Sequence, residues 1–200
     1  MTIVEHYPKP STDILMNFLT THDTERAITR LAGDDVGWNG REWQSCHELS
    51  EEQYAYGVVM MQCAMVLQFF LPGIPSIYYA DETGKEGYKD PFNRGTYPWG
   101  GENEYLLDFT RELGRIRRSC KVFAKGTIKF TDVTNEYAIF EREDKDIGEK
   151  AVIIMNRSKK RLVKSLDIIT GNREYKIAHG RKTDNTISTE PFGYSVIIVK

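Results

Sequence analysis

The sequence predicts an α/β region followed by an all-β domain. Two short apolar runs, Ile14–Leu19 and Ile74–Tyr79, each precede a helix-like segment, as strands do in a parallel α/β fold. From about Val122 onward, apolar residues recur at a period of two, and polar turns separate the runs closely. We therefore expect two βα units over residues 1–120 and an antiparallel β-sandwich domain over residues 121–200.

The composition excludes some classes of partner. The chain has 200 residues, 40% of them hydrophobic, which is enough for a sizeable core. Its net charge of −2 comes from 27 basic and 29 acidic residues that are well mixed, so we expect no nucleic-acid partner. The longest apolar region, Val58–Leu71, is interrupted by Gln62 and Gln68 and predicts a buried helix rather than a membrane span.

The cysteines and the first residues leave the compartment open. Cys46, Cys63 and Cys120 have no metal-binding or redox spacing, so we expect reduced and mostly buried thiols. The first six residues lack the charged start and apolar centre of a secretory signal. A signal further upstream would leave no trace in this chain, so both a cytoplasmic and a secreted protein remain compatible with it.

The first run leads into a helix, a loop and a second, longer helix. We expect the first helix over residues 24–31 and a glycine- and tryptophan-containing loop over residues 33–48. Ser50, with Gln53 three residues later, has the form of a capping box and predicts a helix from there to about Phe70. That helix is apolar on nearly every face, which predicts neighbours on all sides.

The second run leads into a long polar loop, residues 81–101, and then an amphipathic helix. In a compact domain, a loop of this length is usually functional or disordered. The apolar face of the helix carries Leu106, Phe109, Leu113 and Ile116.

The second half predicts several short strands. They are expected at residues 127–131, 137–141, 151–156, 162–167, 174–177, 186–188 and 194–199.

The candidate functional residues begin directly after the first apolar run, with His22 and Asp23. The carboxyl ends of parallel strands meet at the edge of a sheet where ligands bind. From the residues alone, Asp23 is either a functional carboxylate or the cap of the following helix. His22 taken alone is more often a structural histidine than a functional one.

The loop at residues 81–94 is dense in hydrogen-bonding groups and follows the second run. Its carboxylates and guanidinium groups could form paired hydrogen bonds with the vicinal hydroxyls of an uncharged sugar. The alternative is a solvated loop held by its own ion pairs. Trp38, Trp43 and Trp99 could stack on sugar faces, although a single tryptophan is more often a packing residue.

Three segments, in order, resemble the α-amylase family of glycoside hydrolases. NFLTTHD at residues 17–23 resembles the family's strand-seven motif, and LPGIPSIYYADE at residues 71–82 is similar to its eighth-strand segment. DPFNRGTYPWG at residues 90–100 looks like the version in neopullulanase, cyclomaltodextrinase and amylopullulanase relatives. Two departures are Thr20-Thr21, where the family commonly has Asx and then Asn or Ser, and Ala80, which replaces a usual glycine.

The resemblance covers about residues 12–120 and implies a fold and site roles. The fold would be the last two βα units of a (β/α)8 TIM barrel, followed by the family's C-terminal β domain. Asp23 would be the third catalytic carboxylate, which stabilises the oxocarbenium-like transition state, and His22 would bind the same sugar. Asp90 and Arg94 would hold the next sugar toward the non-reducing end.

The family's nucleophile and acid/base lie on strands four and five, and retaining glycosidases need both. We therefore expect a C-terminal fragment of a retaining α-glucan hydrolase that is inactive alone. The parent would act on α-1,4 bonds, with α-1,6 bonds as the further option, in starch, pullulan or maltooligosaccharides. The alternative is a non-catalytic carbohydrate-binding or interaction module derived from an amylase tail. We expect no cofactor in this chain, although the parent could hold calcium, and we expect self-association through the truncated barrel.

Overall fold

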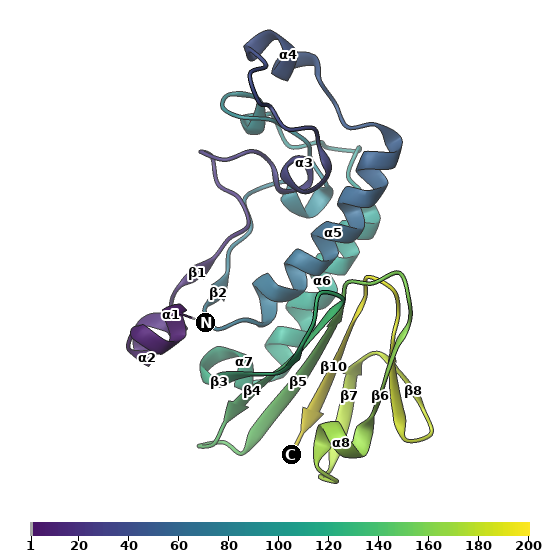
Figure 1. The fold of residues 1–200 in the computed structure, drawn as a ribbon. Helices are drawn as coiled ribbons and strands as arrows, with labels where there is room; N and C mark the ends of the chain where they lie inside the picture. Colours follow the sequence, from purple (N-terminus) through teal and green to yellow (C-terminus); the bar gives the residue numbers. More distant parts are fainter. Residues whose placement is uncertain (1) are drawn as a thin grey trace. The chain divides into compact units, whose positions relative to one another are not determined.

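The structure is a computed structural model that describes residues 2–200 (Figure 1). Contacts between residues divide the chain into two units. The strand unit contains the segment ending at Asn17, Phe69–Ile74 and Leu113–Lys200. The helical unit contains Phe18–Gln68 and Pro75–Glu112. Two long helices have residues in both units, so the division follows contacts rather than a single linker.

The helical unit is built from short helices and the two long ones. Their bounds are α3 (Ala27–Ala32), α4 (Arg41–Cys46), α5 (Glu51–Phe70), η1 (Asp81–Thr83), η2 (Phe92–Arg94) and α6 (Glu104–Ser119). Helix α4 lies in the stretch that we expected to be a loop, residues 33–48, so that expectation was wrong for six residues. Helix α3 begins three residues later than expected, because its N-cap is Arg26 and the residues before it form a turn.

Helix α5 has the bounds that the sequence predicts, and the capping box explains its start. The backbone N–H of Ser50 donates to Gln53 Oε1 at 2.9 Å, and the N–H of Gln53 donates to Ser50 Oγ at 3.2 Å. These reciprocal bonds satisfy two donors that the first turn cannot satisfy internally. The helix is buried on all sides only toward its C-terminal half, where Met61, Met65 and Phe70 are fully enclosed.

The first strand pair is much shorter than the sequence predicts. Strands β1 (Met16–Asn17) and β2 (Ile74–Pro75) form a two-stranded sheet, and the Ile74 N–H donates to the Leu15 carbonyl at 2.7 Å. The predictions of strands over Ile14–Leu19 and Ile74–Tyr79 were therefore wrong in length. A two-stranded ladder gives each strand one partner, which limits how far pairing extends. Helices α1 (Thr2–His6) and α2 (Lys9–Asp13) precede β1.

The second half of the chain forms two antiparallel sheets in the strand unit. The five-stranded sheet has the order β3-β4-β5-β10-β7, and the three-stranded sheet has the order β6-β9-β8. The bounds are α7 (Val122–Lys125), β3 (Thr127–Val133), β4 (Tyr137–Asp144), β5 (Glu149–Asn156), β6 (Leu162–Ser165), α8 (Leu166–Thr170), β7 (Tyr175–His179), β8 (Arg181–Thr183), β9 (Thr186–Thr189) and β10 (Tyr194–Val199).

Both faces of the five-stranded sheet are buried at its centre. On one face, a core cluster joins the sheet to Leu166 of α8 and Ile187 of β9. On the other face, the Phe70 ring lies 4.9 Å from the Phe123 ring and 6.2 Å from the Tyr194 ring. The cluster consists of Ile139, Val152, Ile154, Leu166, Ile187, Ile197 and Val199.

Two arginines hold the C-terminal end of α5 within the strand unit. Arg142 is fully buried and donates from Nη1 to the Phe70 carbonyl at 2.8 Å and from Nη2 to the Gly126 carbonyl at 2.8 Å. Arg117 donates to the carbonyls of Phe69 and Gly73. Burial, with Arg117 nearby, lowers the pKa of Arg142 to about 10. The bonds to Phe69 and Phe70 satisfy carbonyls that the last turn of α5 leaves unpaired.

Within residues 2–200, Cys46, Cys63 and Cys120 form no disulfide; Cys46 is exposed, and Cys63 and Cys120 are buried. Across residues 2–200, none of the helices combines the length and apolar character that crossing a membrane requires.

Candidate functional site

The segment after β1 folds into a threonine-supported turn rather than directly into a helix. The Thr21 N–H donates to Thr24 Oγ1 at 2.9 Å, and the Asp23 N–H donates to Thr21 Oγ1 at 3.2 Å. No side-chain bond caps α3, whose N-cap is Arg26. The interpretation of Asp23 as a helix cap was therefore wrong, and its carboxylate extends from a turn with 72% of the side chain exposed.

The structure brings the four predicted site residues together in the helical unit. Arg94 is their common partner: its Nε lies 2.7 Å from Asp90 Oδ1 and donates to the His22 carbonyl at 3.1 Å, and its Nη2 lies 3.7 Å from Asp23 Oδ1. His22 Nε2 lies 3.3 Å from the same Asp23 oxygen. Two carboxylates, an imidazole and a guanidinium, all solvent-accessible, thus form one polar cluster.

A pocket of about 580 Å³ opens beside this cluster. It includes both carboxylates, Asp23 and Asp90, together with donors from Arg30 and Lys89. An open pocket with charged donors and acceptors suits a polar, hydroxyl-rich ligand better than an apolar one. The full lining is Leu19, Thr20, Asp23, Thr24, Glu25, Arg30, Lys89 and Asp90.

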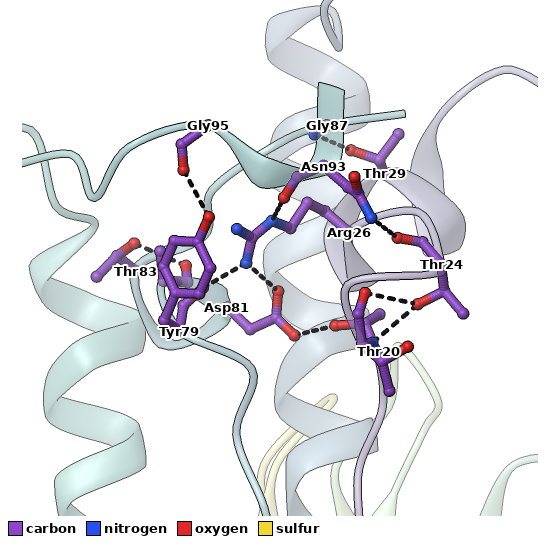
Figure 2. Close-up of polar contacts among 12 residues, drawn as sticks. Thr20, Thr24, Arg26, Thr29, Tyr79, Asp81, Thr83, Gly87, Asn93 and Gly95 are labelled. Carbon is purple, nitrogen blue, oxygen red and sulfur yellow. Dashed lines mark hydrogen bonds and ion pairs between the residues drawn. The ribbon is translucent and has the colours of Figure 1, made fainter. Parts of the chain in front are cut away.

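Beneath the exposed cluster lies a buried network that the sequence reasoning missed (Figure 2). Arg26 is fully buried; its Nε donates to the Asn93 carbonyl at 2.7 Å, and its Nη1 contacts the Tyr79 carbonyl and lies 3.3 Å from Asp81 Oδ1. The Thr20 hydroxyl donates to the other oxygen of Asp81. The network therefore joins the segment before α3 to the loop that follows β2.

Asn93 connects the buried network to the exposed cluster. Its side-chain amide donates to the carbonyls of His22, at 2.8 Å, and Thr24, at 2.6 Å, on either side of Asp23. The side chain is fully buried, so its position is fixed by packing as well as by these bonds. Asn93 and Arg26 thus hold the backbone that carries the Asp23 carboxylate.

The electrostatics of the network are dominated by burial. Burial raises the pKa of Asp81, and the hydrogen bond from Thr20 and the charge of Arg26 oppose that rise. The guanidinium of Arg26 also lies 4.3 Å from the centre of the Tyr78 ring and 4.5 Å from that of Tyr79. These contacts compensate a fully buried positive charge.

Ala80, the residue before Asp81, is one of the two departures from the family pattern. Ala80 is buried and has φ of 68°, in the left-handed region that glycine adopts most easily. The family's usual glycine fits that conformation, so the alanine here adopts it at some energetic cost. Hydrogen bonds on both sides of Ala80 hold this conformation by closing the η1 turn.

The sequence carries no signal for the buried network, because Arg26 and Asp81 lie 55 residues apart and charged side chains are seldom fully buried. Within residues 2–200, no three His, Cys, Asp or Glu side chains gather in a way that could hold a metal ion.

No protein-family model matches the sequence. An amylopullulanase from Thermoanaerobacterium thermosulfurigenes is 32% identical over 203 residues, which cover 90% of this chain and 10% of that protein. A cyclomaltodextrinase from Thermoanaerobacter pseudethanolicus is 28% identical over 89% of this chain and 27% of its own length. The chain thus spans about a tenth to about a quarter of these two relatives.

A solved structure shows the same fold. The cyclic α-maltosyl-(1→6)-maltose hydrolase of Arthrobacter globiformis, in complex with cyclic α-maltosyl-(1→6)-maltose, has a TM-score of 0.74 and 23% sequence identity, over 99% of this chain and 38% of that one. The solved structure supports the fold, and the sequence relatives support the family. The chain spans only part of the length of these relatives, and it belongs to the α-amylase family of glycoside hydrolases.

Proposed function

We propose that residues 1–120 form the last two βα units of a (β/α)8 barrel, and that residues 121–200 form a C-terminal β-sandwich domain. Supporting this, β1 precedes α5 in the chain and β2 precedes α6, as in successive βα units. The two antiparallel sheets share a core cluster, as the layers of a sandwich do. In this arrangement, the segments after β1 and β2 face the ligand-binding end of the barrel.

In the proposed site, Asp23 acts on a glucose residue at the point of cleavage. Its carboxylate stabilises the oxocarbenium-like transition state, in which positive charge develops on the sugar. His22 binds the same sugar, and Asp90 and Arg94 hold the next sugar toward the non-reducing end. The observation that carries this proposal is the exposed Asp23 carboxylate, which extends from a turn toward Arg94 and His22 instead of capping a helix.

The substrate class follows from the relatives' names and the chemistry of the pocket. Amylopullulanases, cyclomaltodextrinases and the cyclic maltosyl-maltose hydrolase are named for α-glucans, so we place an α-1,4 or α-1,6 glucan or maltooligosaccharide in this site. Carboxylates and a guanidinium suit vicinal hydroxyls. The nucleophile and the acid/base would come from elsewhere in a complete barrel, so the 200-residue chain alone should not hydrolyse these substrates.

A second function, a carbohydrate-binding module without catalysis, is favoured by one observation. All four exposed groups and the buried network beneath them come from this chain, so the site needs no other chain to be preformed. Both functions predict sugar binding, and only the first predicts that Asp23 matters more for turnover than for affinity.

The test is a hydrolysis assay on the purified 200-residue chain with starch, pullulan and a chromogenic maltooligosaccharide. We expect no turnover above background, and we expect a maltooligosaccharide to perturb the NMR signals of His22. Turnover that persists through purification and disappears in Asp23→Ala would overturn the proposed inactivity. Unperturbed His22 signals at saturating sugar would overturn the site assignment.

A further inference from the structure

The backbone on both sides of Asp23 is bonded to one buried side chain, that of Asn93. Asn93 Nδ2 donates to the carbonyls of His22 at 2.8 Å and Thr24 at 2.6 Å, and Figure 2 shows the second of these bonds. A side-chain amide nitrogen carries two N–H groups, so a single asparagine satisfies both carbonyls. Because the Asp23 side chain is 72% exposed, the direction of its carboxylate depends on this backbone.

Arg94, the next residue along the chain, contacts the same carbonyl from the exposed side. Its Nε donates to the His22 carbonyl at 3.1 Å and lies 2.7 Å from Asp90 Oδ1. A carbonyl oxygen has two lone pairs, and Asn93 and Arg94 together supply donors for both. The His22 carbonyl therefore joins the turn that carries Asp23 to the η2 turn that carries Arg94.

Asn93 is itself held from its other side. Its side chain is fully buried, and its own carbonyl accepts from Arg26 Nε at 2.7 Å. The backbone at Gly87 comes so close that a side chain there would bring its Cβ within 2.5 Å of the Phe92 carbonyl oxygen and 2.9 Å of Asn93 Cα. The Gly87 carbonyl in turn accepts from the Arg26 N–H at 2.9 Å. The amide donor is thus fixed before any ligand binds, as a supporting residue of a preformed site must be.

The two joined turns carry the two proposed sugar positions. His22 and Asp23 contact one glucose residue in the proposed site. Asp90 and Arg94 contact the next, and Arg94 Nη2 lies 3.7 Å from Asp23 Oδ1. Neighbouring glucose residues of a glucan are also joined at a fixed separation. A ligand that spans both positions therefore depends on the spacing between the turns, whereas a single glucose does not.

We propose that Asn93 is a positioning residue that sets the spacing between these two sugar positions. It acts without touching the substrate, because it is fully buried, and it favours a ligand that spans both positions over a single glucose. The inference rests on the proposed function for the identity of the two sugars. The hydrogen bonds that carry it depend on no ligand.

The test is an NMR titration of the complete 200-residue chain with glucose and with maltose, followed at the backbone amides of His22 and Arg94. We expect the wild-type chain to bind maltose about tenfold more tightly than glucose, because one linked ligand occupies both positions. Asn93→Asp keeps the size of the side chain but replaces its N–H donors by an oxygen. This variant should reduce the maltose-to-glucose affinity ratio to about twofold or less, and Asn93→Ala should do the same.

The matched control is Asn156→Asp in the strand unit. Asn156 is also buried, at 1% exposure, and its Nδ2 donates to the carbonyls of Lys160 at 2.7 Å and Glu190 at 3.0 Å. Its replacement removes the same kind of buried donor without changing the two turns. The affinity ratio of Asn156→Asp should therefore equal that of the wild type, even where the urea midpoint falls.

Two titration results would overturn the inference and leave the proposed function intact. They are an unchanged ratio in both Asn93 variants, and equal losses in Asn93→Asp and Asn156→Asp, because the ratio would then follow fold stability. Rapid solvent exchange of the Asn93 side-chain amide protons in the wild type would also overturn it, even if both Asn93 variants failed to fold. A wild-type chain that binds neither sugar, with displaced amide signals of residues 22–24 in Asn93→Ala, would refute the proposed sugar site and keep Asn93 as the residue that positions Asp23.

Discussion

Replacing Arg26 by methionine tests whether the buried network supports the site. Arg26 and Asp81 are almost completely buried, at 0% and 5% side-chain exposure, and their charged atoms lie 3.3 Å apart. Met keeps much of the side-chain volume but removes the charge and every donor. Asp81 then loses its cation, and the carbonyls of Asn93 and Tyr79 lose a donor.

The expected loss of unfolding free energy is about 3–5 kcal/mol, the usual cost of leaving one partner of a buried ion pair uncompensated. The lower end applies if Asp81 protonates, which its raised pKa favours. Replacing both partners, in Arg26→Met/Asp81→Leu, should restore part of the loss because no buried charge remains.

Tryptophan fluorescence during urea unfolding is the appropriate measurement, because Trp38, Trp43 and Trp99 all lie in the helical unit. The matched control is Arg111→Met in the same unit, whose side chain is 58% exposed and 2.8 Å from Asp108, itself 73% exposed. Surface pairs contribute about 0–1 kcal/mol, so this variant should unfold almost as the wild type does. A loss below about 1 kcal/mol in Arg26→Met would refute the reasoning.

Three further predictions concern pH, substrate binding and assembly. Because burial raises the pKa of Asp81 above 3.8, the folded state binds more protons than the unfolded state between 3.8 and the raised pKa. Stability should therefore fall as pH rises through that window, and urea midpoints across it should lose this slope in Asp81→Asn; an unchanged slope would refute it. In a complete barrel, Arg94→Ala should raise KM more than it lowers kcat, and steady-state kinetics showing the reverse would contradict its ground-state role. Light scattering should detect self-association through the exposed apolar residues of Ile14–Leu19 and Ile74–Tyr79, and limited proteolysis should leave a core near Val122–Lys200; a clean monomer with uniform resistance would contradict both.

Local signals predicted the elements whose stability is encoded locally. Helix α5 begins where Ser50 and Gln53 form their capping box, and β10 has the predicted bounds because Val196–Val199 is a continuous run of β-branched residues, which favours a buried strand. The prediction of secondary structure failed where packing against distant parts of the chain determines the local conformation. The strand predicted over residues 162–167 ends two residues too late, because Leu166 and Asp167 begin helix α8, where Leu166 is anchored in the core.

The polar strand β8 and the buried charges were missed for related reasons. Arg181–Thr183 has no apolar residue, and its pairing with β9 is what makes it a strand. Arg26 has a residue type that is seldom fully buried, so no pattern indicates that Asp81, Tyr78 and Tyr79 enclose it. Asp23 and Arg94, in contrast, were predicted as site residues from sequence motifs. A motif records residue types at fixed spacing, and it does not depend on how the rest of the chain packs around them.

The role of Asp23 is the central claim. The measurement is the turnover number of Asp23→Asn when this chain is fused to the preceding part of the cyclomaltodextrinase relative, which supplies the upstream strands. Removing a negative charge that faces a developing cation should lower kcat by about 100-fold or more, whereas Asp108→Asn, whose side chain on helix α6 is as exposed as that of Asp23, should leave kcat nearly unchanged. Asp23→Asn with turnover within about tenfold of the parent fusion would contradict the account, because the carboxylate would then act in folding or binding and not on the transition state.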